Sequence, residues 1–209
     1  VFFMGTVKWG ILGAAKIAKE QVIPAMKKSK NTELYAIASR DISKAEDFCH
    51  KFSITKAYDD YNKLISDPNI DAVYIPLPNH LHIPFSINAL KAGKHVLCEK
   101  PISITSDEIF ELIEVQKETK KIVSEAFMVR FHPQWPETKK LIQEGEIGKL
   151  NAIQGLFNYF NTDPNNIRND VRIGGGSILD IGVYPIVISR FITDAEPCLL
   201  YTSPSQRDL

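Results

Sequence analysis

Short apolar runs alternate with amphipathic segments along the first 127 residues of the chain. The apolar runs predict buried strands over residues 6–12, 34–39, 72–75, 95–98 and 123–127. The segments between them predict helices over residues 15–28, 42–51, 60–66, 84–92 and 105–120. Asp41 is suited to cap the second helix, and Thr105 with Glu108 forms a capping box for the last one. This alternation is typical of an α/β fold whose parallel sheet is covered on both faces and binds ligands at the carboxyl ends of its strands.

The pattern changes after residue 127. Helices are predicted over residues 133–144 and, after a run of three glycines, from about Ser177 to Ile192. Residues 150–159 alternate like a strand of a different kind of sheet. We therefore expect one domain over residues 4–127 and a partial second domain over residues 128–197. Residues 198–209 continue neither pattern and resemble translated adapter DNA, so we expect a non-native tail, the alternative being a genuine short polar C-terminus.

The amino-acid composition bears on which binding partners and which cellular location we expect. The 25 basic and 25 acidic residues balance, so no overall field favours nucleic acid or an anionic membrane. The apolar runs are too short to span a bilayer. The three cysteines have neither metal nor disulfide spacing, which favours a reduced, cytoplasmic location.

The first strand leads into a turn that is suited to the pyrophosphate of a dinucleotide. Gly13, Ala15 and Ala18 form a G-x-A-x-x-A variant of the glycine fingerprint, with alanine at the usual second glycine. An ordinary strand-to-helix turn is the alternative interpretation. The amides that would point at the phosphates from the start of the helix belong to Ala14, Ala15, Lys16 and Ile17.

The end of the second strand predicts which dinucleotide binds. An acidic residue there would bind the ribose hydroxyls of NAD, whereas this strand ends in Ser39 and Arg40. A guanidinium and a hydroxyl suit a 2′-phosphate, and Lys44 lies one helical turn further on. Asp41 argues for NAD but is better placed as a helix cap. The sequence favours NADP, with NAD still open.

The loop after the third apolar run of this region contains two prolines and several polar side chains. Such a stiff loop, with Leu77 and Pro78, is suited to lie against the nicotinamide ribose, and Asn79 and His82 would supply polar contacts. His80 and His82 lack the acidic or cysteine partners of a metal site, so no metal is expected.

Two further segments carry candidate catalytic groups. Lys100 follows a core strand, between Glu99 and Pro101, where its ammonium can polarise a substrate hydroxyl. A surface lysine is the alternative. Asp180 and Tyr184 are four residues apart, so they would share one face of a helix, although a capped helix with a satisfied tyrosine explains the spacing equally well.

At these residues the chain resembles the Gfo/Idh/MocA family of glucose-fructose oxidoreductase and inositol dehydrogenase. The matching segments, which run from about residue 7 to 190, are WGILGAAKIA, AIASRD, PLPNHLH, GKHVLCEKP, EAFMVRFHPQW and GGGSILDIGVYPI. The resemblance implies an N-terminal Rossmann dinucleotide-binding domain and a C-terminal α/β domain with an open, mainly antiparallel sheet. It implies that the chain is C-terminally truncated and that the full-length form is a homo-oligomer.

The resemblance also assigns roles to residues. Lys100 matches the catalytic lysine, Asp180 the substrate-side aspartate, and Tyr184 the position where many members have an acid/base histidine. Tyrosine there resembles the branch that contains trans-dihydrodiol dehydrogenase and NADP-dependent D-xylose dehydrogenase. Arg168 would face the cofactor cleft.

We therefore expect an NADP-dependent oxidoreductase that transfers hydride between nicotinamide and a CH–OH group of an aldose or cyclic polyol or diol. Tyr184 would take the hydroxyl proton while Lys100 orients the hydroxyl and Asp180 holds the substrate. The alternatives are a non-catalytic NADP(H)-binding regulator, an NAD-dependent inositol-type dehydrogenase, and a fragment without independent function.

Overall fold

The computed structural model describes residues 5–200, which fall into two units. The first unit contains the chain up to Phe127 together with Thr162–Asp180, and the second contains Met128–Asn161 and the residues from Ile181 onward. The expected non-native tail lies mostly outside the described residues.

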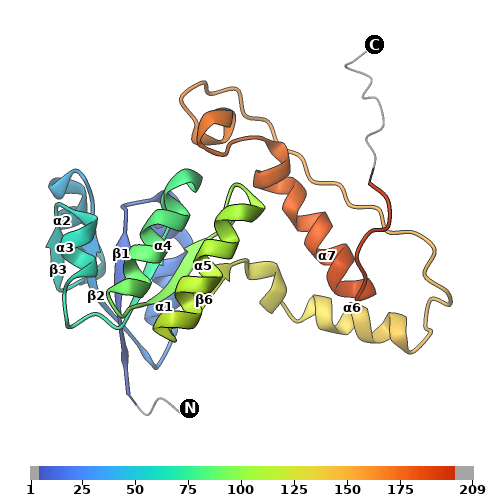
Figure 1. Ribbon diagram of the computed structural model, residues 1–209, viewed down its shortest axis with the longest axis horizontal. Helices are drawn as coiled ribbons and strands as arrows, with labels where there is room; N and C mark the ends of the chain where they lie inside the picture. Colours follow the sequence, from blue (N-terminus) through green and yellow to red (C-terminus); the bar gives the residue numbers. More distant parts are fainter. Residues whose placement is uncertain (1–4, 201–209) are drawn as a thin grey trace. The chain divides into compact units, whose positions relative to one another are not determined.

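A six-stranded parallel sheet forms the centre of the first unit (Figure 1). Its order is β3-β2-β1-β4-β5-β6, so the strand order reverses between β1 and β4. The connections that follow the strands on either side of such a reversal leave toward opposite faces of the sheet, and a crevice for a ligand forms outside the carboxyl ends of these strands. The strands are β1 (Val7–Leu12), β2 (Thr32–Ala38), β3 (Lys56–Tyr58), β4 (Ala72–Ile75), β5 (His95–Glu99) and β6 (Val123–Ala126).

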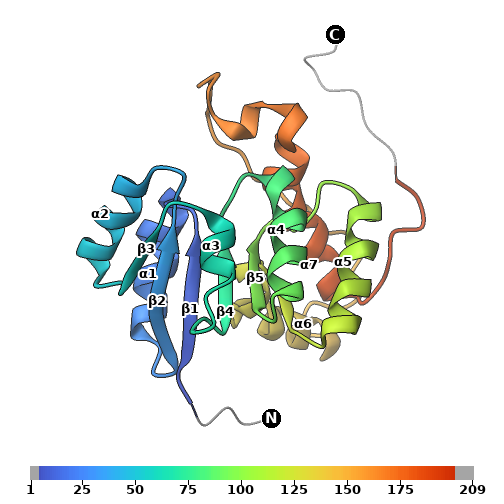
Figure 2. The same cartoon turned by 60° about the vertical axis from the view of Figure 1, so that its left-hand side comes forward.

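Helices cover both faces of this sheet (Figure 2). Successive side chains of a strand point to opposite faces, so Ile11 and Leu12 of β1 enter two different cores. Ile11 packs in the core under α1 and α2, and Leu12 in the core under α3, α4 and α5. The α-helices are α1 (Ile23–Lys28), α2 (Ile42–Phe52), α3 (Tyr61–Ile65), α4 (His82–Lys91) and α5 (Ser106–Thr119).

Local sequence signals explain how several helices begin. The Asp41 carboxylate accepts the Ser43 amide at 3.2 Å, and the capping box of Thr105 and Glu108 is present, so both predicted caps are confirmed. The first helical segment contains a π-helical turn, Ala18–Val22, just before Pro24. Proline lacks an N–H and so removes one regular helical hydrogen bond, which explains an irregular turn at this place.

The second unit is helical and lacks the expected strand. Its α-helices are α6 (Gln134–Gln143) and α7 (Val183–Thr193), and the Lys139 ammonium pairs with Asp194 at 2.5 Å. The prediction of a strand over residues 150–159 is wrong, because the described residues there have no strand pairing. A Cβ on Gly155 would lie 2.5 Å from Pro185, so this segment packs against the start of α7. An isolated strand leaves its backbone groups unpaired, and no described segment supplies a partner for it.

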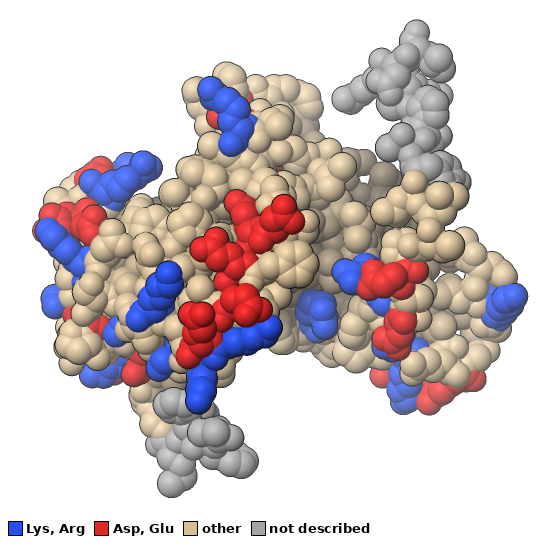
Figure 3. Space-filling view, in the orientation of Figure 1, with Lys and Arg blue, Asp and Glu red and all other residues tan. Residues whose placement is uncertain are grey.

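The described strands are all parallel, so the mainly antiparallel sheet expected for the second domain is not found among residues 5–200. No described helix is both long enough and apolar enough to cross a bilayer. On the face shown in Figure 3, acidic side chains gather over α5, whose exposed residues include Asp107, Glu111, Glu114 and Glu118.

A buried carboxylate joins β3 to the loop before β4. The Asp67 side chain is 3% exposed and accepts hydrogen bonds from the Tyr58 hydroxyl at 2.5 Å and Lys56 Nζ at 3.1 Å. The Asn69 amide donates to its other oxygen at 2.9 Å. Burial alone would raise the pKa of the Asp67 carboxyl, but these hydrogen bonds outweigh it and hold that pKa well below its ordinary value.

Substituting Asp67→Asn should lower the free energy of unfolding at pH 7 by about 1–3 kcal/mol, because one buried acceptor oxygen becomes an NH₂ group that cannot accept its hydrogen bonds. The folded-state pKa of Asp67 is lowered, so its ionised carboxylate stabilises the fold above the unfolded-state pKa of about 4, and that contribution is lost as the pH falls below it. Denaturant unfolding of both proteins at pH 7 and pH 3 measures the difference. The exposed Asp59→Asn variant is the control, and a loss for Asp67→Asn that does not shrink at low pH would contradict this assignment.

Candidate active site

The turn after β1 is shaped for close approach of a ligand. Gly13 has a φ of +110°, and a Cβ there would lie 3.0 Å from Leu77 in the loop after β4. The first helical hydrogen bond runs from the Lys19 amide to the Ala15 carbonyl at 3.1 Å. The amides before Lys19 therefore have no helical acceptor, as at other phosphate-binding helix starts. Gly13 thus allows this turn to pack closely on the loop after β4, and the amides at the start of the helix are of the kind that binds a pyrophosphate.

The remaining predicted residues of this turn lie at the start of the helix. Both side chains are exposed, and the Lys16 ammonium lies 4.0 Å from the Glu20 carboxylate. This contact of the side chain does not involve the backbone amides of Lys16 and Ile17.

The end of β2 presents a cation rather than an acid. Asp41 is engaged as the cap of α2, and the Ser43 hydroxyl, with the Lys44 charge, lowers the pKa of its carboxyl. Lys44 Nζ lies 3.5 Å from that carboxylate. Ser39 is buried and its hydroxyl oxygen accepts the Asp41 amide at 3.3 Å. Arg40 is exposed, and no hydrogen bond or ion pair within residues 5–200 occupies its guanidinium.

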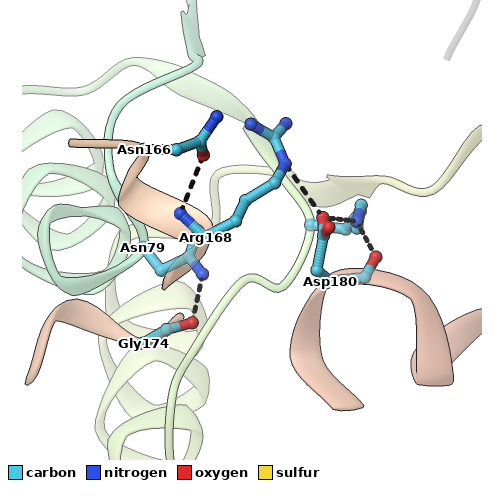
Figure 4. Close-up of polar contacts among 6 residues, drawn as sticks. Asn79, Asn166, Arg168, Gly174 and Asp180 are labelled. Atoms are coloured by element: carbon cyan, nitrogen blue, oxygen red, sulfur yellow. Dashed lines mark hydrogen bonds and ion pairs between the residues drawn. The ribbon is translucent and has the colours of Figure 1, made fainter. Parts of the chain in front are cut away.

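The loop after β4 anchors the glycine-rich segment. Asn79 donates its side-chain amide to the Gly174 carbonyl at 2.7 Å (Figure 4). Gly174 has a φ of +85°, and a Cβ there would lie 2.8 Å from Ile104 and 3.0 Å from Asn79. Glycine is therefore required at position 174, where this segment contacts the loop after β4 and the loop before α5. Pro78 precedes the short helical turn that carries Asn79.

His82 does not offer a polar atom to a cofactor, contrary to our expectation. The side chain is 1% exposed, and its Nδ1 and Nε2 each lie 2.7 Å from a backbone carbonyl, of Pro101 and Leu77 respectively. The expected polar contact with the cofactor is therefore replaced by two contacts inside the protein. His82 is the first residue of α4, directly after the loop where it was expected, and the partners of its ring depend on how two loops fold.

Two residues that sequence analysis missed hold the segment around Lys100. The buried Tyr74 hydroxyl of β4 donates to the Glu99 carboxylate, and burial, with the charge of Glu99, raises the pKa of Tyr74, which keeps its proton. The Glu125 carboxylate of β6 accepts the Ile102 amide at 2.9 Å. A charged residue inside an apolar strand, such as Glu125, is the signal that could have identified one of them.

Lys100 and Asp180 are joined across 80 positions of the chain. The Lys100 ammonium donates to the backbone carbonyl of Asp180 and lies 3.2 Å from its carboxylate. Both side chains are only 15% exposed. Arg168 Nε donates to the same carboxylate oxygen at 3.2 Å, and its backbone amide donates to Asn166 (Figure 4). The Asp180 carboxylate therefore contacts two cationic side chains.

Tyr184 belongs to the second unit. It lies in the first turn of α7, with its ring centroid 5.3 Å from that of Phe157. Asp180 lies in a π-helical turn, Ile178–Gly182, so the α-helical spacing that predicted a shared face with Tyr184 does not apply along this whole stretch. The shared face remains a prediction.

No group of three metal-ligating side chains from His, Cys, Asp or Glu lies together in the part of the chain that the structure describes.

Two family models match the chain in order. A model of an oxidoreductase family with an NAD-binding Rossmann fold matches residues 7–127, and a model of the GFO/IDH/MocA C-terminal domain matches residues 135–205. The chain belongs to the Gfo/Idh/MocA oxidoreductase family. The resemblance seen in the sequence motifs is thereby confirmed, as is an N-terminal Rossmann domain.

Similar members of the Gfo/Idh/MocA family span several activities. An uncharacterized oxidoreductase of Rhizobium meliloti is 48% identical over 93% of this chain and 58% of its own length. A D-xylose 1-dehydrogenase (NADP(+)) of Haloferax volcanii is 36% identical over 96% of this chain and 61% of its own length. The structure of a 3-ketoreductase from Actinomadura kijaniata with NADP and TDP-benzene matches with a TM-score of 0.87, 35% identity, and coverage of 90% of this chain and 58% of that chain. The chain thus spans about 60% of the length of these Gfo/Idh/MocA relatives.

Substituting Gly13→Ala should destabilise the first unit by about 1–3 kcal/mol, because the positive φ strains any side chain and Leu77 crowds the new methyl group. Gly93→Ala is a matched control, since Gly93 has a φ of +79° but its nearest neighbour, Lys121, would lie at 3.9 Å. Thermal unfolding compares the two variants. A loss for Gly13→Ala no larger than that for Gly93→Ala would show that the contact with Leu77 is unimportant.

Proposed function

We propose that this protein is an NADP-dependent oxidoreductase that removes a hydride and a proton from a CH–OH group of a sugar, polyol or diol, leaving a carbonyl. The observation that carries the proposal is the largely buried ammonium of Lys100, held by Asp180 at the carboxyl edge of a sheet that also carries a dinucleotide turn. Proteins with an open parallel sheet bind their ligands at the carboxyl ends of the strands.

Residues at the carboxyl ends of β1, β4 and β5 bind the cofactor in this proposal. Amides at the start of the helix after Gly13 bind the pyrophosphate, and the loop of Leu77 and Pro78 lies against the nicotinamide ribose. When bound, the nicotinamide ring supplies the hydride acceptor. Glu99, fixed by Tyr74, lines the same edge of the sheet.

Lys100 acts on the substrate hydroxyl. Its ammonium donates a hydrogen bond to the reacting oxygen and stabilises the negative charge that grows there as the O–H proton leaves. Asp180, held by both Lys100 and Arg168, is the residue to which we assign the binding of the substrate. We assign the proton to the phenol of Tyr184, on the basis of its place four residues after Asp180 and the resemblance of this segment to its family.

The choice of NADP rests on the end of β2. Asp41 is occupied as a helix cap, so it is not available to bind the ribose hydroxyls. Arg40 is exposed directly after Ser39, and its guanidinium is suited to a 2′-phosphate. Lys44, which pairs with Asp41, adds a second positive charge in the first part of α2. The xylose dehydrogenase and the 3-ketoreductase to which the chain is similar carry NADP in their names, which supports the same choice.

Substituting Lys100→Met should lower kcat by about 10²–10⁴-fold, because the methionine side chain has a similar length but cannot donate a hydrogen bond. NADP affinity should change little. The assay is NADPH formation across a panel of aldoses, polyols and diols, with NADP affinity measured by fluorescence titration. Lys117→Met, which removes an exposed lysine of α5, is the control. Near-normal turnover by Lys100→Met would refute its catalytic role, and NADP binding without turnover by the unsubstituted protein would favour the non-catalytic regulator.

Substituting Arg40→Asp should weaken NADP binding by about 10–100-fold, the loss expected for one hydrogen-bonded charge pair, while NAD binding is unchanged or improved. Competitive titration of both dinucleotides measures the ratio of dissociation constants. Lys51→Asp makes the same charge change at the far end of α2 and serves as the control. An unchanged NADP-to-NAD ratio in Arg40→Asp would contradict this assignment.

A further inference from the structure

His82 lies between two loops that carry proposed functional residues. It is the first residue of α4, it is 1% exposed, and both loops follow neighbouring strands of the parallel sheet. Nδ1 lies 2.7 Å from the carbonyl oxygen of Pro101, which follows Lys100 directly. Nε2 lies 2.7 Å from the carbonyl oxygen of Leu77, in the loop after β4.

The chemistry of these contacts gives His82 a defined function in the fold. A carbonyl oxygen accepts hydrogen bonds and cannot donate them, so a contact is a hydrogen bond only where the ring nitrogen in it carries a proton. At least one ring nitrogen always does, so the ring donates to at least one loop and packs against the carbonyl of the other. Because the ring is buried, water cannot replace a lost hydrogen bond without cost.

The segment around Lys100 has fixed points on both sides. Before it, the Glu99 carboxylate accepts a hydrogen bond from Tyr74. After it, the Ile102 amide donates a hydrogen bond to the Glu125 carboxylate, and the Pro101 carbonyl contacts Nδ1 of His82. The contact of His82 is the one made to the residue directly after Lys100, and it connects that residue to the loop of Leu77.

We propose that His82 is a positioning residue, which sets the direction of the Lys100 side chain through Pro101 and the place of the cofactor loop through Leu77. This inference rests on the catalytic role proposed for Lys100. It assigns one consequence to each ring nitrogen: Nδ1 supports turnover, and Nε2 supports cofactor affinity.

Two conservative substitutions separate these consequences. The amide nitrogen of His82→Asn replaces Nδ1 and can donate to Pro101, whereas that of His82→Gln replaces Nε2 and can donate to Leu77. His82→Phe fills the same buried space and donates to neither. Ser86→Ala, in the same helix and equally buried, is the control for general disturbance of α4.

The kinetic test measures kcat at saturating substrate and the dissociation constant of NADP for each variant, with thermal unfolding to confirm folding. We expect His82→Asn to keep near-normal kcat but bind NADP more weakly, and His82→Gln to keep its NADP affinity. In His82→Gln and His82→Phe, kcat should fall by about 100-fold, the cost of a small misplacement of a catalytic group. Equal losses of both quantities in the Asn and Gln variants, as a general folding defect would produce, would overturn the proposal.

A second readout does not depend on activity. Limited acetylation with acetic anhydride, followed by mass spectrometry, compares the labelling rate of Lys100 with that of the exposed Lys117. Lys100 should be labelled several-fold faster in His82→Gln and His82→Phe than in the unsubstituted protein, and unchanged in His82→Asn. Unchanged labelling in all three variants would refute the positioning role. If the unsubstituted protein shows no turnover, the proposed function fails while this labelling still decides the role of His82.

Discussion

A pairing of opposite charges, largely removed from water, joins the glycine-rich segment to the carboxyl edge of the sheet. Lys100 and Asp180 are each 15% exposed, so their pairing offsets part of the cost of removing the two charges from water. Removing one partner of such a pair leaves a poorly solvated charge and typically costs about 3–5 kcal/mol. The same pairing keeps an ammonium in a fixed place at the edge of the sheet where ligands bind, which is the requirement for positioned catalysis.

The surrounding structure supports this pair from several directions. The reversal of strand order between β1 and β4 places the turn of Gly13 against Leu77, and β5 next to β4 brings Glu99 and Lys100 to the same edge. The glycine-rich segment approaches closely because Gly174 has no side chain to clash with Ile104 and Asn79. Arg168 then holds the Asp180 carboxylate from the other side. The site therefore combines a rigid sheet with loops fixed by side-chain hydrogen bonds.

Much of the first unit could be predicted from the sequence because its signals are local. Apolar runs correspond to strands, of which β4 is buried at every position, and Asp41 and Thr105 mark helix starts by their own hydrogen bonds. The predicted strand at residues 150–159 failed because pairing depends on partners elsewhere in the chain, which alternation alone does not reveal. His82, Tyr74 and Glu125 depend likewise on which loops meet in space. The sequence indicated that His82 lies near the end of β4. It could not show that backbone carbonyls would contact both nitrogens of its ring.

The most direct test is an experimental structure of the protein with bound NADP. The account predicts that the pyrophosphate lies on the amides after Gly13, the 2′-phosphate on Arg40, and the nicotinamide at the edge of the sheet beside Lys100, which remains paired with Asp180. A dinucleotide bound at this turn with its nicotinamide directed away from Lys100, or one bound elsewhere on the first unit, would contradict it.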